Sequence, residues 1–101
     1  MFIAITKTYF DPEIKDRISK MTEESATLVR SLKGFVSRRT HLATDGSHFM
    51  TYWEWQTKED HEACMTHPGW AEFNREWGEL TESGKLRFEL KTYETIDALT
   101  I

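Results

Sequence analysis

The stretch from Trp55 to Trp70 constrains the fold more than any other, because a strand pattern passes there directly into a helix pattern. A run rich in aromatic and β-branched residues ends at Trp55. Thr57 then suits a helix N-cap, with Asp60 three residues later in a weak version of the capping box. Pro68-Gly69 interrupts that helix after about three turns, because proline cannot donate the backbone hydrogen bond that a helix interior needs. Such a junction is typical of a mixed α+β fold.

The first third of the chain has the same alternation of strand and helix patterns. Phe2 to Phe10 reads as a strand, and it ends at Asp11-Pro12, where Asp suits an N-cap and Pro the first helical position. Apolar and small residues then recur at helical spacing until Gly34 ends the segment. This stripe, which predicts one continuous helix, consists of Ile14, Ile18, Met21, Ser25, Leu28 and Leu32.

Asp45-Gly46 separates two further strand patterns, residues 35–44 and 47–56, and predicts a hairpin with a type I′ turn. The expected register places four pairs on one face, which we assign to the helices. These pairs are Leu42 with Phe49, Thr40 with Thr51, Arg38 with Trp53, and Val36 with Trp55. The other face, with Phe35, Met50 and Tyr52, is more polar yet keeps aromatic and methionine surface.

The remaining patterns complete a six-element order. A second buried stripe, formed by Trp70, Phe73, Trp77 and Leu80, predicts that the helix restarts at Pro68. Residues 85–94 alternate apolar and charged side chains, which indicates a strand. Strand, helix, strand, strand, helix, strand is the order of the α+β, ferredoxin-like split β-α-β (β-α-β-β-α-β) fold, a four-stranded antiparallel sheet with helices on one face. We expect residues 1–101 to form a single domain of this kind.

Two helices cover only one face of such a sheet, so we expect a homodimer that forms through the open sheet face. The apolar residues of the tail, 95–101, would then lie across the partner. The formal net charge of −4, with acids and bases interspersed, provides no basic surface for a nucleic acid partner. Lys7 interrupts the apolar start too early for a signal peptide or a membrane span, and the single cysteine excludes an internal disulfide. We therefore expect a cytoplasmic protein with no membrane association.

The junction residues also carry a family resemblance. Trp55, Thr57, His61 and the His67-Pro68 break before Trp70 resemble the antibiotic biosynthesis monooxygenase family of dimeric α/β barrels. Gly34-Phe35 and the segment 88–93 also fit, so that the resemblance covers nearly the whole chain. It implies the fold above more strongly than any one chemistry, because members include cofactor-free oxygenases of aromatic polyketides, haem-degrading enzymes and proteins of unknown activity.

The haem-degrading members use an Asn on the first strand and a Trp and a His on the second helical region. The matching positions here hold Ile5 or Thr6, Cys64 and Asn74, and Asn74 is the only asparagine in the chain. This argues against haem degradation. Haem binding through His61 or His67 is left as an alternative.

The cofactor-free members place a Trp at the end of the third strand, and Trp55 matches it. Such a reaction needs a base or cation to stabilise the substrate anion, and a cavity that excludes water. Arg38 lies on the predicted helix-facing side, and His61 would face the same cavity, so we predict both as catalytic residues. The predicted substrate-binding residues, in a pocket between the sheet and the second helix, are Thr51, Trp53, Trp55, Cys64, Trp70, Phe73 and Asn74. We expect no cofactor and no metal.

Our hypothesis is thus a cofactor-independent monooxygenase that oxidises a small aromatic or polyketide-like compound. The alternative is a non-catalytic ligand-binding or interaction dimer, in which the same aromatic residues only fill the core. Arg38 would then extend to the sheet edge, and Cys64 would be a buried small apolar residue.

Overall fold

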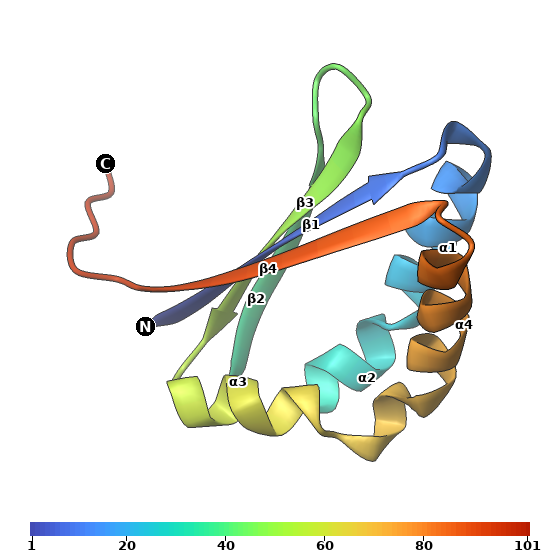
Figure 1. Ribbon diagram of the computed structural model, residues 1–101. Helices are drawn as coiled ribbons and strands as arrows, with labels where there is room; N and C mark the ends of the chain where they lie inside the picture. The colour runs from blue at the N-terminus through green and yellow to red at the C-terminus, as the bar shows by residue number, and fades with distance from the viewer.

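The computed structural model describes residues 1–101 and consists of one antiparallel sheet with every helix on the same face (Figure 1). The strands are β1 (Phe2–Phe10), β2 (Phe35–Leu42), β3 (His48–Trp55) and β4 (Leu86–Glu94), and they lie in the order β2-β3-β1-β4. The predicted ferredoxin-like fold is therefore confirmed. Both central strands, β1 and β3, have a neighbour on each side, while β2 and β4 form the edges.

The first helical region contains a break that the predicted continuous stripe lacks. A 3₁₀ turn, η1 (Pro12–Ile14), leads into α1 (Lys15–Glu24), and α2 (Ala26–Ser31) follows after Ser25. The Ser25 hydroxyl donates to the carbonyl of Thr22 at 2.7 Å, a local bond that competes with the regular helix pattern. After the break, a different side of α2 faces the core. Val29 is therefore fully buried, whereas Leu28, which belonged to the predicted apolar stripe, is only half-buried.

The second helical region begins as predicted and differs in its burial. Thr57 caps α3 (Lys58–Met65) by accepting from the Asp60 amide at 3.1 Å. A 3₁₀ turn, η2 (Pro68–Trp70), then leads into α4 (Ala71–Glu82), and the His67 ring caps that turn. The prediction of a buried stripe on this segment is wrong, because α4 contains no buried residue. Its apolar side faces a cavity instead.

A β-bulge changes the end of the predicted β2–β3 register. Three predicted pairs, from Leu42 with Phe49 to Arg38 with Trp53, are confirmed. The fourth is wrong, because the register shifts between Phe35 and Ser37 and sets Phe35 opposite Trp55. The ring of Phe35 packs edge-on against Trp55 at 5.7 Å, while Val36 is 42% exposed. Phe35 therefore belongs to the helix side of the sheet, and its predicted place on the open face is wrong.

The hairpin turn also differs from the predicted type I′. That type needs a positive φ at both Asp45 and Gly46, and only glycines have positive φ in this chain. The Gly46 amide instead donates to the Ala43 carbonyl at 2.8 Å, and the Asp45 carboxylate accepts from the Ser47 amide at 2.9 Å. The loop is therefore longer, with Asp45 in an Asx turn rather than in a two-residue connection.

The core consists of two separate clusters at opposite ends of the sheet. One cluster joins Phe2, Leu32, Trp55 and Cys64, and the other joins Ile14, Ile18 and Leu86. Only 14 of the 101 residues are buried, which leaves a middle region between sheet and helices that side chains do not fill. No helix is long and apolar enough to span a membrane.

Gly34 provides a test of the packing between β2 and α3. Gly34 has φ +77°, and a Cβ there would overlap the Asp60 side chain, whose Cβ lies 2.6 Å away. We expect Gly34→Ala to lower the free energy of unfolding by about 2–4 kcal/mol, from the left-handed backbone and the overlap together. Gly84→Ala is the matched control, because Gly84 has φ +78° in open space. Urea unfolding of the two variants separates the cost of the left-handed backbone from the cost of the overlap with Asp60. Equal losses of stability would contradict the contribution of the overlap.

Candidate active site

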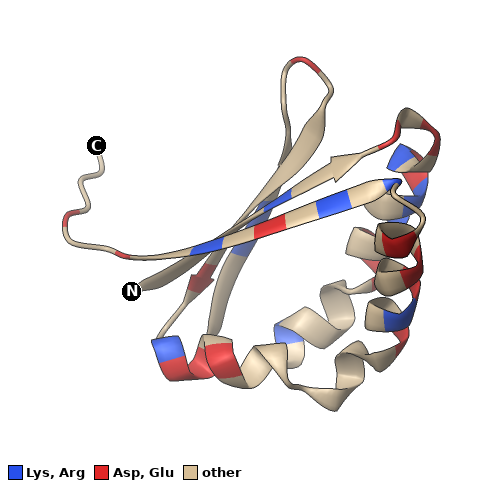
Figure 2. Cartoon of the chain, viewed as in Figure 1, with Lys and Arg blue, Asp and Glu red and all other residues tan.

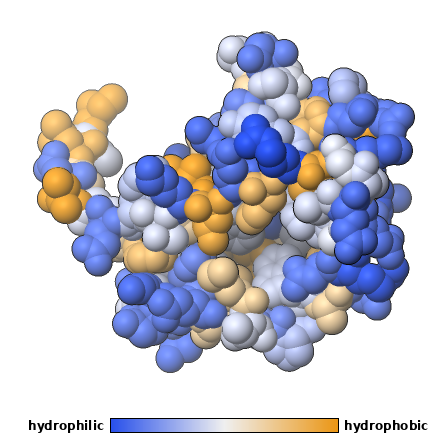
Figure 3. All heavy atoms as spheres, viewed as in Figure 1, coloured by the Kyte–Doolittle hydropathy of each residue, from blue (hydrophilic) through white to orange (hydrophobic).

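A cavity of about 360 Å³ lies between the helix-facing side of the sheet and the helices (Figure 3). Thirteen of the 22 residues that line it are hydrophobic, so most of its wall is apolar. All nine residues predicted from the sequence line this one cavity. They are Arg38, Thr51, Trp53, Trp55, His61, Cys64, Trp70, Phe73 and Asn74. The cavity differs from the prediction in one respect: α1 also forms part of its wall, through Ile18, Met21 and Thr22.

The strand register arranges the sheet side of the cavity in rows. Ala4, Trp53 and Arg38 are direct partners across β1, β3 and β2, and form one row. Thr6, Thr51 and Thr40 form the next row, and the Thr40 and Thr51 hydroxyls share a hydrogen bond of 3.2 Å. Because side chains alternate along a strand, every member of these rows faces the helices. A line of hydroxyl groups therefore crosses an otherwise aromatic surface.

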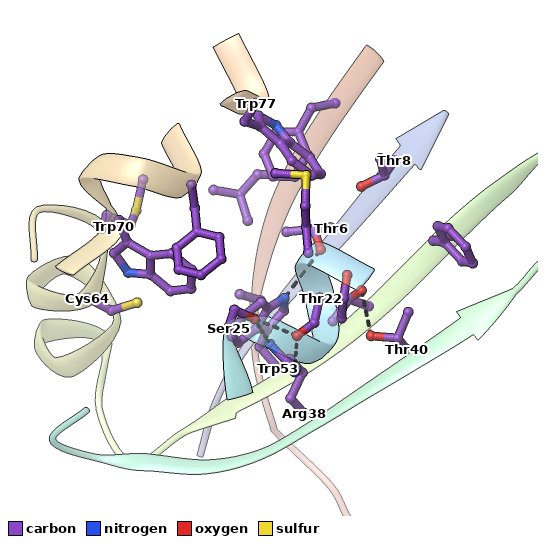
Figure 4. A pocket seen from close by; sticks show the side chains of 18 of the residues that line it. Thr6, Thr8, Thr22, Ser25, Arg38, Thr40, Trp53, Cys64, Trp70 and Trp77 are labelled. Carbon is purple, nitrogen blue, oxygen red and sulfur yellow. Dashed lines mark hydrogen bonds between the residues drawn. The ribbon is translucent and has the colours of Figure 1, made fainter. Parts of the chain in front are cut away.

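Arg38 lies on the helix-facing side of β2 without a carboxylate partner (Figure 4). Its guanidinium donates to the Ser25 hydroxyl at 2.8 Å and to the Thr22 carbonyl at 3.1 Å, at the end of α1. The guanidinium carbon also lies 5.4 Å from the centroid of the Trp53 ring. Burial lowers the pKa of Arg38, and the charge of Arg30 lowers it further. The alternative in which Arg38 extends to the sheet edge is therefore wrong, because these contacts hold it at the wall of the cavity.

His61 is buried on α3, with its ring packed against Phe2 and Trp55 at centroid distances of 5.3 and 5.8 Å. Burial lowers its pKa below the ordinary value of 6.5, and the nearby Glu62 opposes that effect. The imidazole is thus held in its neutral form at pH 7, the form that accepts a proton.

The buried neutral His61 predicts a pH dependence of stability. Because the pKa of His61 is lower in the folded state, the unfolded chain binds more protons below pH 6.5, and the free energy of unfolding falls as pH falls from 7 to 5. We expect His61→Phe, which retains a ring, to show a smaller slope in urea unfolding across this range. His41→Gln, at an exposed position, should keep the wild-type slope. An unchanged slope in His61→Phe would contradict the assignment.

The other predicted residues differ in their exposure. Trp55 is 1% exposed, and its indole nitrogen is the one buried side-chain polar atom without a hydrogen-bond partner. Burial raises the pKa of the Cys64 thiol, which keeps Cys64 protonated and unreactive. Trp70 and Phe73 are half-buried with their rings edge-on at 5.8 Å, and Asn74 is exposed where it meets the cavity.

The sequence prediction included the hydroxyl of Thr51 and missed the other five hydroxyl groups of the cavity. Thr6, Thr8, Thr22, Ser25 and Thr40 all line it, and Figure 4 shows their side chains among the aromatic rings. The alternation of Ala4, Thr6 and Thr8 along β1 was a usable signal, since it places them on one face. Ser25 belonged to the predicted helical stripe, but the contacts of Ser25 and Thr22 with Arg38 join two distant elements and had no local signal.

The residues present do not fit a haem iron. The Nδ1 atom of His67 accepts from the Gly69 amide at 3.0 Å in a cap outside the cavity. His61 lines the cavity, but no hydrogen bond to its other ring nitrogen orients it as a metal ligand. No group of three or more His, Cys, Asp or Glu side chains lies close enough together to hold a metal ion. Neither candidate histidine is therefore arranged to hold a haem iron.

Comparison with known proteins shows a likeness in sequence over part of the chain and a likeness in fold over almost all of it. No family model matches the sequence. Tetracenomycin-F1 monooxygenase from Streptomyces glaucescens is 34% identical over 56 residues, which are 55% of this chain and 47% of that enzyme. The chain thus spans about half the length of that curated relative.

Solved structures match over almost the whole chain. A Deinococcus radiodurans protein classed with the antibiotic biosynthesis monooxygenases matches 100% of this chain and 98% of its own, with a TM-score of 0.82 and 16% identity. SnoaB, a cofactor-independent oxygenase from Streptomyces nogalater, matches 97% of this chain and 95% of its own, with a TM-score of 0.78 and 11% identity. Such identities establish shared architecture rather than shared chemistry. The chain therefore has the fold of the antibiotic biosynthesis monooxygenase family.

Proposed function

We propose that the protein is a cofactor-independent monooxygenase whose cavity binds a small aromatic compound as its phenolate or enolate anion. One observation carries this proposal: Arg38 is the only charged side chain among the residues that line the cavity. A largely apolar space with a single cation and no carboxylate suits a flat anion, because the cation stabilises its charge while the walls exclude water. The likeness to SnoaB and to Tetracenomycin-F1 monooxygenase supports the same class of reaction.

The chemistry assigns separate roles to His61 and Arg38. Neutral His61 accepts the proton of an activated CH₂ or hydroxyl group, and Arg38 stabilises the resulting anion. The anion gives electrons to O₂, and a new carbon–oxygen bond forms. For an anthrone, loss of water from the peroxide breaks the O–O bond: the CH₂ becomes C=O, one oxygen atom stays in the product and the other leaves as water. The substrate supplies all the electrons, so the step balances without a further reductant.

An oxygen electrode combined with mass spectrometry tests this function. Metal-free protein is mixed with a panel of hydroquinones, anthrones and naphthols. We expect oxygen uptake coupled to a product that has gained one oxygen atom. Binding of several panel members without any oxygen uptake would contradict the enzyme and favour a ligand-binding protein.

We further propose that two copies associate through the open sheet face. Ile5, Met50 and Tyr52 lie together there in the strand register. One cation of this face, Arg87, is partly neutralised, since it bonds Glu89 at 2.6 Å and lies 4.0 Å from the Tyr9 ring centroid. Acidic side chains instead follow α3 and α4 on the other side of the molecule (Figure 2). The tail beyond β4 extends away from the sheet, with Ile96, Leu99 and Ile101 almost fully exposed (Figure 1).

Analytical ultracentrifugation at micromolar concentration tests the dimer. We expect a mass near twice 11.9 kDa for the wild type and near 11.9 kDa for Met50→Glu, because a buried charge opposes association. Met65→Glu is the control, since Met65 is exposed at the cavity and not on the open face. A monomeric wild type, or a Met50→Glu dimer of unchanged affinity, would contradict the proposal.

A further inference from the structure

We propose that Thr6 is a further substrate-binding residue: its hydroxyl donates a hydrogen bond to the oxygen of a bound phenol or phenolate, and Trp53 is the positioning residue that orients it. This inference rests on the proposed function, because it assumes that the cavity receives an oxygen-bearing aromatic ring. It adds a residue of β1 to the proposed binding site, and it requires that the bound compound carry an oxygen that accepts a hydrogen bond. Sequence reasoning assigned Thr6 no role in binding.

A hydrogen bond joins Trp53 on β3 to Thr6 on β1. The indole nitrogen of Trp53 lies 3.3 Å from the Thr6 hydroxyl oxygen, on neighbouring strands (Figure 4). An indole N–H only donates, so the Thr6 oxygen must be the acceptor. The proton of the Thr6 hydroxyl is then directed away from Trp53, and it has no acceptor within the protein. Thr6 therefore presents an oriented, unused donor.

The other hydroxyl groups of the cavity do not have this property. Thr22 and Ser25 donate to the carbonyls of Ile18 and Thr22, so their protons are used inside α1. Thr40 and Thr51 bond each other, which leaves one proton of the pair unused. Either hydroxyl can be the donor, so neither is fixed as the acceptor. The Thr8 hydroxyl lines the cavity and makes no side-chain hydrogen bond, so no partner orients it. Only at Thr6 does the partner fix the oxygen as the acceptor, because an indole N–H cannot accept, so only there is the free proton assigned to one residue.

Trp53 also brings the donor close to the cation. Arg38 lies over the Trp53 ring at 5.4 Å from its centroid, and Thr6 contacts the nitrogen of the same indole. Ala4, the direct partner of Trp53 on β1, has only a methyl group as its side chain, so it leaves space in the cavity beside the indole ring. An oxygen anion above the indole would meet the Thr6 proton and the positive charge of Arg38. No carboxylate of the cavity competes for either.

The ligand class follows from these donors. A ring oxygen that accepts, such as a phenolate, an enolate or a quinone carbonyl, satisfies Thr6 and Arg38 together. A hydrocarbon of the same shape leaves the Thr6 donor unpaired and the charge of Arg38 without an anion, and an aromatic amine offers them no acceptor oxygen. The cavity should therefore select oxygenated rings over their methyl analogues.

A pair of probes separates the hydroxyl contribution from shape. 4-Nitrophenol and 4-nitrotoluene differ only in hydroxyl against methyl, and nitrophenolate absorbance reports how much of the bound phenol is ionised. We expect the wild type to bind 4-nitrophenol more tightly and to raise its ionised fraction. Thr6→Val, which replaces the hydroxyl by a methyl group, should bind 4-nitrophenol roughly tenfold more weakly and lose part of the ionisation. Affinity for 4-nitrotoluene should be unchanged, and Thr6→Ser should restore both effects.

Trp53→Phe tests the positioning role through a second variant. Phenylalanine keeps an apolar ring without the N–H, so we expect a smaller loss for 4-nitrophenol than in Thr6→Val. Unchanged 4-nitrophenol affinity and ionisation in both variants, with 4-nitrotoluene still bound, would overturn this inference and leave the proposed function standing. Failure of the wild type to bind either probe would overturn both. Circular dichroism confirms that each variant is folded, and Thr6→Ala replaces Thr6→Val where the latter is not.

Discussion

Trp55→Ala is expected to lower the free energy of unfolding by about 3–5 kcal/mol, the range for removing a large buried aromatic side chain. The Trp55 ring packs against Trp53 and Phe35 on the sheet and His61 on α3, so its removal opens a void between the sheet and the second helical region. A domain of this size is stable by only about 5–15 kcal/mol, so the loss is a large share of the total. Urea unfolding followed by circular dichroism measures it.

Trp77→Ala is the matched control for this prediction. Trp77 is also a cavity tryptophan, but it lies half-buried on α4, edge-on to Phe88 at 5.6 Å. Solvent can enter the space it leaves, so we expect a loss of about 1–2 kcal/mol. Equal losses in the two variants would show that Trp55 is not the centre of the core.

Arg38→Met is expected to weaken the binding of nitrophenolate by roughly 10- to 100-fold, the effect of losing a charge-assisted hydrogen bond of about 1.5–3 kcal/mol. Methionine keeps much of the apolar stem of arginine and removes the only charge of the cavity. Arg39→Met is the control, because Arg39 is the next residue on the same strand and is exposed on the opposite face. Titration of both variants with 4-nitrophenol at a pH above its pKa measures the difference.

Arg38 also bonds the end of α1, so the same variant should lose about 1 kcal/mol of stability. Arg38→Lys separates the two roles. Lysine retains the charge and loses the planar fork that reaches both Ser25 and Thr22. We expect Arg38→Lys to keep most of the phenolate affinity and to lose stability as Arg38→Met does. An Arg38→Met variant that binds nitrophenolate as tightly as the wild type would contradict the proposed role of Arg38 in binding the anion.

The sequence was a good guide where the pattern is local. The Thr57 cap, the four strands and the register from Leu42 to Arg38 depend on residues that are near in sequence or on the two-residue period of a strand. That period placed Arg38 and Trp53 on the helix side, and the junction at Trp55 placed His61 beside them. All nine predicted site residues therefore line one cavity, although their catalytic and binding roles stay predictions.

The features that the sequence did not predict depend on contacts between distant elements. The bulge of β2 sets the Phe35 ring against Trp55, and the Ser25 hydroxyl and the Thr22 carbonyl meet Arg38 on β2. Whether an aromatic stripe is buried or lines a cavity depends on how far α4 lies from the sheet. The free proton of Thr6 likewise depends on the side chain of Trp53, 47 residues away along the chain. Periodicity and capping are properties of a segment, whereas a cavity and its polar groups are set by the spacing between segments.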